Sequence, residues 1–122
     1  MLIAANPPAP PPAAEARAAV VCVSAVGRRP LFFSGKLVGT KPGYKPPANT
    51  SFELPLQAAA PQCNNLLRSK VAQWSLSVTT PGFTPCALAA PEFGYRVTYA
   101  AKAGSKGLSC AQVSRTPIGT WK

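Results

Sequence analysis

The sequence predicts an all-β fold: a β-sandwich of six to seven short strands that follows an extended N-terminal arm. Two observations carry this prediction. The 15 prolines among 122 residues are about twice the usual share, and so many prolines break helices and favour turns. In addition, several segments alternate apolar and polar residues with the period of a strand, and turn pairs such as Pro81-Gly82 separate them.

The arm comprises residues 1–17, and residues 18–122 are expected to form a single domain, because a chain of 122 residues supports one core and not two. The run NPPAPPP in the arm favours an extended, polyproline-like conformation without helix or sheet hydrogen bonds of its own. Such an arm suits contact with a neighbouring subunit or with its own domain. The candidate assembly residues are Asn6, Pro7, Pro8, Pro10, Pro11 and Pro12.

Three strands are expected in the first half of the domain. Residues 18–26 are apolar and β-branched on both faces, as in a central strand, and residues 31–40 are a second candidate. Residues 51–57 alternate regularly, and because Pro55 cannot donate a ladder hydrogen bond, this strand belongs at a sheet edge. The candidate edge residues are Phe52, Leu54, Pro55 and Leu56.

The second half of the domain is expected to contain one short helix and three strands. Residues 61–70 suit a helix, with Pro61 in the first turn, where its missing N–H costs nothing. Residues 71–80 alternate as a strand, and residues 94–114 read as a hairpin whose turn carries two glycines. The inward side of the first hairpin strand is expected to be Tyr95, Val97, Tyr99 and Ala101.

The hairpin carries a resemblance to a known family. The run Leu88-x-x-Pro91, Tyr95-x-Val97-x-Tyr99-x-Ala101-x-x-Gly104, with Ser109, Val113 and Thr116 after it, resembles the last two strands of fibronectin type III and related immunoglobulin-like domains. The resemblance spans residues 88–116, about a quarter of the chain. It implies an immunoglobulin-like sandwich in which a tyrosine makes a corner contact and the glycine-bearing loop joins strands F and G. The chain departs from the family because Trp74 lies closer to Tyr95 than the usual core tryptophan does. A fold of this kind does not by itself give a function.

The composition argues against catalysis. The chain has no His and no Asp, so neither a Ser–His–Asp nor a Cys–His nucleophile can form within it. The three glutamates, Glu15, Glu53 and Glu92, lie far apart in sequence, and no glycine-rich phosphate loop is present. We therefore expect a protein that is not an enzyme and that holds no cofactor.

The four cysteines leave two alternatives open. Because no C-x-x-C pair occurs, a structural zinc site is not expected. In a sandwich, Cys22 on a central strand could face Cys110 on the last strand, which would leave Cys63 to pair with Cys86. The alternative is four buried thiols that pack as small apolar residues. The even number favours disulfides, whereas the lack of a basic and apolar export signal at the start favours thiols.

The charge is strongly positive, because 13 Lys and Arg face only three acidic residues, which gives a formal net charge of +10. Such a field suits nucleic acid or the acidic surface of a neighbouring protein. Residues 27–47 combine basic residues with Phe32, Phe33 and Tyr44 and contain no acid, although both phenylalanines would suit a core equally well. The candidate anion or partner contacts are Arg28, Arg29, Lys36, Lys41 and Lys45.

Three functional hypotheses follow. The first is a non-catalytic structural subunit of a large assembly, such as a virion or phage coat, decoration or tail component, which clamps neighbouring subunits through its arm and sheet edges. The second is a secreted, disulfide-bonded immunoglobulin-like binding module of the extracellular space or cell envelope. The third is a basic subunit that binds nucleic acid or belongs to an organellar complex. All three are compatible with a chain that has no apolar run of about 18 residues and so no expected membrane span.

Overall fold

The computed structural model describes residues 17–39, 43, 51–58, 60–69 and 72–118. These residues form strands and no helix, which confirms the all-β prediction. The strands are β1 (Ala18–Val26), β2 (Phe32–Gly39), β3 (Ser51–Pro55), β4 (Gln62–Leu67), β5 (Ala72–Thr79), β6 (Cys86–Ala87), β7 (Tyr95–Gly104) and β8 (Gly107–Pro117). Within these ranges, nothing has the length and apolar character of a membrane-spanning helix.

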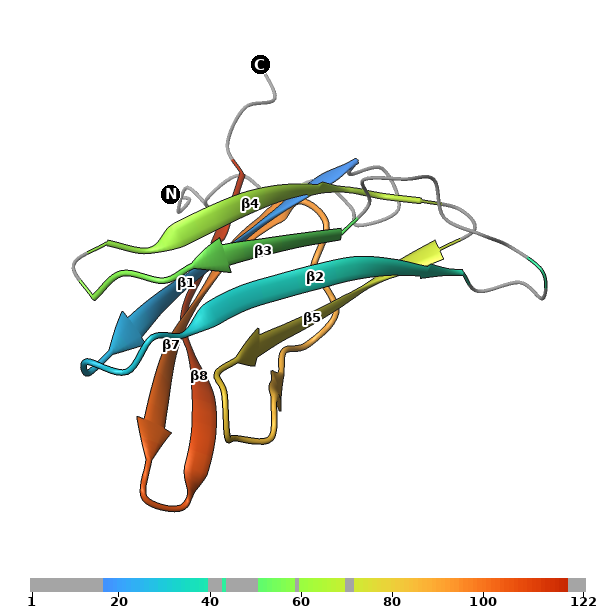
Figure 1. The fold of residues 1–122 in the computed structure, drawn as a ribbon. Helices are drawn as coiled ribbons and strands as arrows, with labels where there is room; N and C mark the ends of the chain where they lie inside the picture. Colours follow the sequence, from blue (N-terminus) through green and yellow to red (C-terminus); the bar gives the residue numbers. More distant parts are fainter. Residues whose placement is uncertain (1–16, 40–42, 44–50, 59, 70–71, 119–122) are drawn as a thin grey trace, which may run out of the picture.

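Two four-stranded sheets pack face to face, as Figure 1 shows. The first sheet has the order β4-β1-β7-β8 and the second has the order β3-β2-β5-β6. The chain therefore forms the β-sandwich that the strand pattern predicts. All pairings are antiparallel except that of β1 with β7, which is parallel. The seven-strand immunoglobulin order, ABED in one sheet and CFG in the other, does not contain such a parallel pair. The structure therefore does not confirm the immunoglobulin-like connectivity, which stays a prediction.

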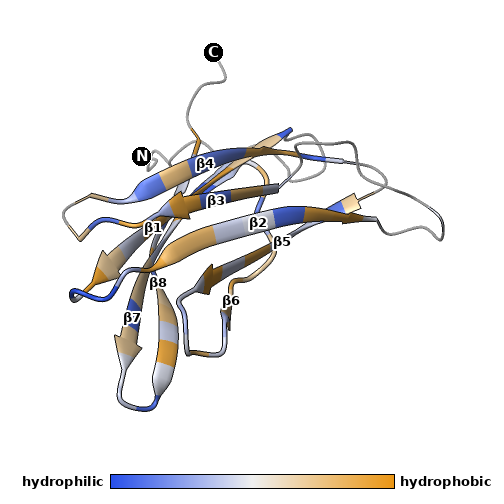
Figure 2. Cartoon of the chain, in the orientation of Figure 1, coloured by the Kyte–Doolittle hydropathy of each residue, from blue (hydrophilic) through white to orange (hydrophobic). Residues whose placement is uncertain are grey.

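The core lies between the sheets and is built from alternate residues of the central strands. Val21 and Val23 of β1 face Phe33 of β2 and Val78 of β5, and all four side chains are buried. The residues predicted to face inward in β7 do so: Val97, Tyr99 and Ala101 are buried and Tyr95 packs against them. Figure 2 shows the resulting alternation of apolar and polar bands along the strands. Removing a large apolar side chain from water contributes roughly 1.5–3 kcal/mol, so these positions hold the two sheets together.

Residues 61–70 do not form the predicted helix. They contain β4, which pairs with β1 in antiparallel register from Ala18–Leu67 to Val23–Gln62. Leu66 is buried in the core while the adjacent Leu67 is exposed, which is the alternation of a strand and not of a helix. Pairing with a central strand outweighs the weak local preference of this segment, as is common for short polar stretches.

The hairpin of β7 and β8 forms as predicted, with Ser105 and Lys106 as its two-residue loop. A register shift between Thr98 and Tyr99 marks a β-bulge in β8. The Tyr99 side chain is buried, and this burial raises the pKa of its phenol, while a hydrogen bond with the backbone of Ala89 acts in the opposite direction. Tyr99 thereby ties β7 to the segment that leads into it.

The cysteines form two disulfides, but not in the predicted pairing. Cys22 is bonded to Cys63, and Cys86 is bonded to Cys110. Cys22 could not reach Cys110, because Val21 and Val23 point into the core and the residue between them points to the outside of its sheet. There Cys22 lies directly opposite Cys63 in the ladder of β1 and β4.

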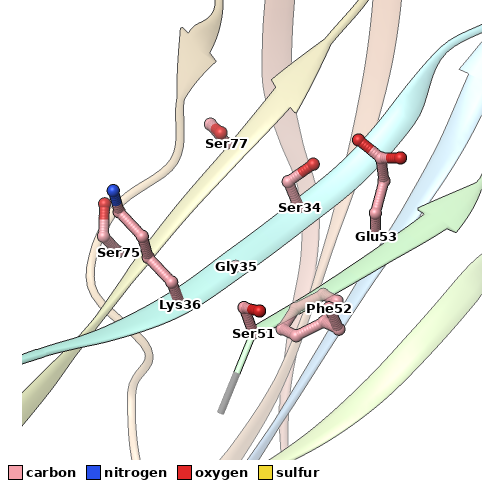
Figure 3. Close-up of a pocket in the computed structure, with 8 residues that line it drawn as sticks. All are labelled: Ser34, Gly35, Lys36, Ser51, Phe52, Glu53, Ser75 and Ser77. Carbon is pink, nitrogen blue, oxygen red and sulfur yellow. The ribbon is translucent and has the colours of Figure 1, made fainter. Parts of the chain in front are cut away.

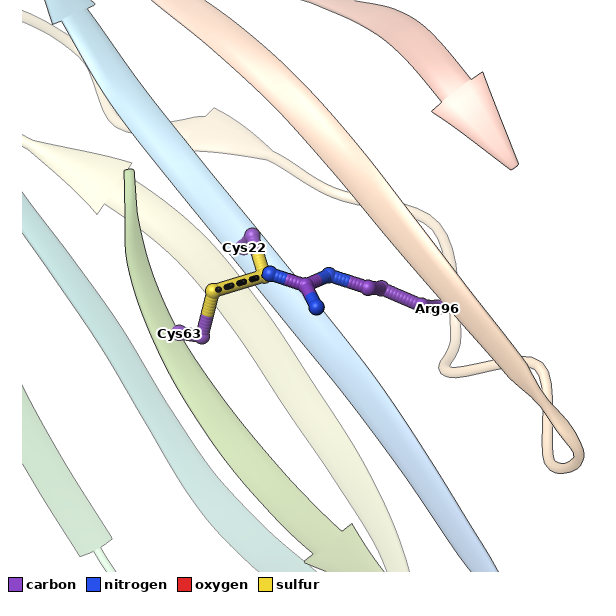
Figure 4. The surroundings of a disulfide bond; sticks show 3 residues. All are labelled: Cys22, Cys63 and Arg96. Carbon is purple, nitrogen blue, oxygen red and sulfur yellow. Dashed lines mark hydrogen bonds between the residues drawn. A yellow bond between two sulfur atoms is a disulfide. The ribbon is translucent and has the colours of Figure 1, made fainter. Parts of the chain in front are cut away.

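The two disulfides have different structural roles. The Cys22–Cys63 bond joins neighbouring strands of one sheet, and the guanidinium of Arg96 donates a hydrogen bond to Cys63 Sγ at 3.6 Å across its outer surface (Figure 4). The Cys86–Cys110 bond instead joins β6 of one sheet to β8 of the other. It therefore anchors the two-residue strand β6, which has few other contacts that could hold it.

Candidate interaction surface

The outermost strand of the first sheet, β8, is long and exposed. It is eleven residues long, and the seven residues 111–117 are exposed on both faces. Among the residues that the structure describes, its sheet neighbour on one side is β7 and no strand lies on the other. The second sheet ends opposite β8 in the short β6. Because β6 is so short, it leaves the inner face of residues 111–117 uncovered, and both faces of this segment are exposed. A long sheet edge of this kind offers a row of backbone donors and acceptors to another chain.

The hairpin geometry shows which backbone groups of β8 face outward. With a two-residue loop, Gly104 and Gly107 form a hydrogen-bonded pair, and hydrogen-bonded and non-hydrogen-bonded pairs then alternate along the ladder. Tyr99 and Gln112 form a non-hydrogen-bonded pair by this count. The N–H and C=O of Gln112 therefore point away from β7, toward the open edge.

Basic side chains follow this edge. On the outer face of the first sheet, Lys102 lies opposite Ser109, and Lys106 occupies the hairpin loop. Arg96 of β7 lies on the same face, but its guanidinium reaches away from β8, to Cys63 of β4. All three side chains are exposed. The surface next to β8 is consequently positive and suits an acidic partner.

Arg115 is the one basic residue of β8 itself, and Glu92 neutralises it. The Nε and Nη2 groups of Arg115 each donate a hydrogen bond to the Glu92 carboxylate. The guanidinium carbon lies 3.8 Å from the centre of the Tyr95 ring. The bond to Arg115 holds the pKa of Glu92 below its ordinary value, and the same bond raises the pKa of Arg115. This cluster fixes the loop before β7 to the exposed half of β8.

Substitution of Glu92 by Gln is expected to lower the free energy of unfolding at pH 7 by up to about 1 kcal/mol, the range for exposed ion pairs. Because the folded pKa of Glu92 is depressed, its contribution is present above the unfolded pKa and is lost as the pH falls through the folded pKa. Urea unfolding of both proteins should therefore show a difference at pH 7 that closes in acid. A difference that persists at pH 2 would show that lost packing, not charge, causes it.

The predicted edge strand, β3, does lie at a sheet edge, but it offers a less suitable edge for pairing than β8 does. β3 is the outermost strand of the second sheet, with β2 as its neighbour. The apolar residues Phe52, Leu54 and Leu56 pack against the core. The strand is five residues long and ends at Pro55, and a short edge with a proline resists pairing.

Among the residues that the structure describes, the basic residues predicted to form one contact surface do not lie together. Arg28 and Arg29 are exposed in the turn between β1 and β2, and Arg29 stacks 4.7 Å from the Phe83 ring. Lys36 lies in the middle of β2, on the outer face of the second sheet. Phe33, a proposed stacking residue, is fully buried. Lys41, Lys45 and the six arm residues Asn6, Pro7, Pro8, Pro10, Pro11 and Pro12 lie outside the described residues.

The outer face of the second sheet carries a shallow polar hollow of about 330 Å³. Ser34, Lys36, Glu53, Ser75 and Ser77 line it, and Figure 3 shows their side chains on one side of the sheet. Serine needs a neighbouring base to act as a nucleophile, and a chain without His or Asp offers no Ser–His–Asp arrangement. Over the described part of the chain, no three His, Cys, Asp or Glu side chains gather into a group that could hold a metal ion.

Comparisons with known proteins assign the chain to no family. No protein-family model matches the chain, and no curated protein matches it. A solved structure described as a "putative cell adhesion protein" from Bacteroides ovatus ATCC 8483 is similar, with a TM-score of 0.39 and 10% sequence identity. The match covers 88% of this chain and 46% of that protein, so the chain spans about half the length of the protein it matches.

Proposed function

We propose that the chain is a non-catalytic protein-interaction module that binds an extended segment of a partner protein by adding it as a strand to β8. The observation that carries this proposal is the length of β8 together with the exposure of residues 111–117 at a sheet edge. In strand addition, backbone hydrogen bonds supply the affinity and alternate side chains supply the specificity. The open N–H and C=O of Gln112 stand at the middle of the eleven-residue strand, within this exposed segment.

The partner segment is acidic. The chain carries a formal charge of +10, and β8 alone would separate Lys102 of β7 from the added segment. Neighbouring strands are about 4.8 Å apart, so the added segment would lie about 10 Å from β7, and the attraction acts through the positive field of this surface. Like charges at this distance would repel, so a basic segment is disfavoured.

The module functions in an oxidising compartment, outside the cell or in its envelope. Two disulfides support this location, because such bonds form and persist there and are rare in the cytosol. A disulfide-bonded binding module thereby takes precedence over the virion or phage subunit, whose role in protein contacts it shares. The nucleic-acid hypothesis loses one of its three candidate stacking aromatics, because Phe33 is buried.

The test uses the full oxidised chain and synthetic eleven-residue peptides in which Thr and Val alternate with Glu. The same peptide with Lys in place of Glu, and an acidic peptide interrupted by prolines, are the controls. The acidic peptide is expected to bind and to slow amide hydrogen exchange along β8. The basic and proline-interrupted peptides are expected to leave that exchange unchanged.

Two variants at one position separate backbone pairing from charge attraction. Gln112→Pro removes the outward N–H and is expected to weaken peptide binding about tenfold, the equivalent of one lost hydrogen bond and its contacts. Gln112→Ala keeps the N–H and should bind as the wild type does. Proline is tolerated at an edge position that faces solvent, so both variants should keep the unfolding midpoint. Equal binding by the two variants, or protection elsewhere than β8, would overturn the proposal.

A further inference from the structure

A pocket of about 430 Å³ opens at the end of the sandwich where β4 ends and where β5 and β7 begin. Its walls come from both sheets. Trp74, Pro91 and Phe93 line it together with the basic residue Arg68. Proline-rich segments dock on surfaces lined by aromatic side chains, as this pocket is.

The aromatic groups of this pocket are held in place before any ligand arrives. The indole N–H of Trp74 donates to the Leu67 carbonyl at 3.1 Å, and its ring packs 6.0 Å from the Phe52 ring in the core. On the other wall, the Arg68 guanidinium lies 4.8 Å from the centre of the Phe93 ring. A rigid platform lowers the entropic cost of binding.

The chain enters the domain at this pocket. The Arg17 carbonyl accepts a hydrogen bond from the Arg68 N–H at 2.8 Å, and the Ala18 carbonyl accepts one from the Gly94 N–H at 2.8 Å. Arg68 belongs to one wall of the pocket, and Gly94 directly follows Phe93 of the other. Arg17 and Ala18, the first residues that the structure describes, therefore adjoin both walls of the pocket.

We infer that the proline run of the arm, residues 7–12, docks in this pocket of its own chain. Residues 13–16 form the connection, and four residues span up to about 13 Å, enough to carry the run back onto a pocket that adjoins Arg17. A polyproline segment has no backbone hydrogen bonds to lose and is already extended, so its rings stack on Trp74 and Phe93 at low entropic cost. The short tether gives a high effective concentration.

This inference goes beyond the strand-addition function and does not depend on it. The pocket lies at the end of the sandwich where β7 begins, whereas Gln112 belongs to the edge strand β8. The Gln112 variants leave the pocket unchanged, and the substitutions below leave β8 unchanged. Either proposal can fail while the other stands.

The experiment measures how accessible Trp74 is in the full chain. The sequence has two tryptophans, so Trp121→Phe leaves Trp74 as the single 5-fluorotryptophan resonance in fluorine NMR. A soluble gadolinium chelate then reports exposure through relaxation. The test variant carries Pro8→Gly, Pro10→Gly and Pro11→Gly, and the control carries Leu2→Ser and Ile3→Ser, which change the arm but keep the proline run.

The expected result is that Trp74 is protected in the parent chain and in the Leu2/Ile3 control, and that the glycine variant loses this protection. Its unfolding midpoint serves as the check that the domain remains folded. Equal relaxation in the parent and the glycine variant would overturn the inference. Protection that grows with protein concentration, together with a dimeric mass, would also overturn it, because the arm would then occupy the pocket of another copy.

Discussion

Removal of the Cys22–Cys63 disulfide by the double substitution Cys22→Ala and Cys63→Ala is expected to lower the free energy of unfolding by about 4 kcal/mol. The bond closes a loop of 41 residues, and the chain-entropy relation for a loop of that length gives about this value. Urea unfolding of the oxidised proteins measures the difference. A marginally stable domain has only about 5–15 kcal/mol in total, so the effect is a large fraction of its stability.

The second disulfide provides the matched control. Its loop of 24 residues gives a slightly smaller loss, about 3.5 kcal/mol for Cys86→Ala with Cys110→Ala. This variant should also show a local effect, because β6 loses its anchor to β8. Amide exchange should then accelerate at Leu88, whose N–H donates to the Leu76 carbonyl at 2.9 Å. Losses below about 1 kcal/mol in both variants would contradict the stabilising role that the loop lengths predict.

Substitution of Gly35 by Ala is expected to cost about 1–3 kcal/mol, the range for overpacking a filled core. A Cβ at this position would lie 2.8 Å from Cδ2 of Leu76 and still closer to the ring of Phe52. Phe52 pairs with Gly35 across the ladder of β2 and β3, and its ring fills the space above the glycine. The ring cannot move aside easily, because it stands edge-on to Phe33 at 5.0 Å.

A second-site variant tests this explanation. If the clash with the Phe52 ring causes the loss, then Gly35→Ala should cost less in a Phe52→Leu background than in the wild type, and a double-mutant cycle in urea measures the coupling. Ser34→Ala, on the outer face of the same strand, is the control and should change stability by less than about 0.5 kcal/mol. Additive effects of the two core substitutions would show that the contact with Leu76, not the Phe52 ring, is responsible.

The strands with regular alternation could be predicted from the sequence. In β7 the inward residues were identified correctly, because a buried face imposes a period of two on the side chains. The edge position of β3 followed from Pro55 alone. These predictions depend on local chemistry, which a sequence displays directly.

The predictions that failed depended on partners distant in sequence. Residues 61–70 were expected to be helical, and with that segment misassigned, Cys63 could not be placed opposite Cys22. Residues 18–26 are apolar on both faces, so their pattern did not reveal that Cys22 points outward. The exposure of β8 was equally hidden, because it depends on the short length of β6 in the other sheet.

The place of β1 in its sheet has a consequence for biosynthesis. β1 lies between β4 and β7, and β7 follows β1 in the chain only after β2 to β6, so the parallel neighbour of β1 is synthesised long after β1 itself. Until then one side of an apolar, β-branched strand has no ladder partner, and contacts between such distant segments form slowly. Newly made chains are therefore most prone to aggregate before β7 emerges, and a chaperone that shields residues 18–26 during this interval would raise the yield of folded protein.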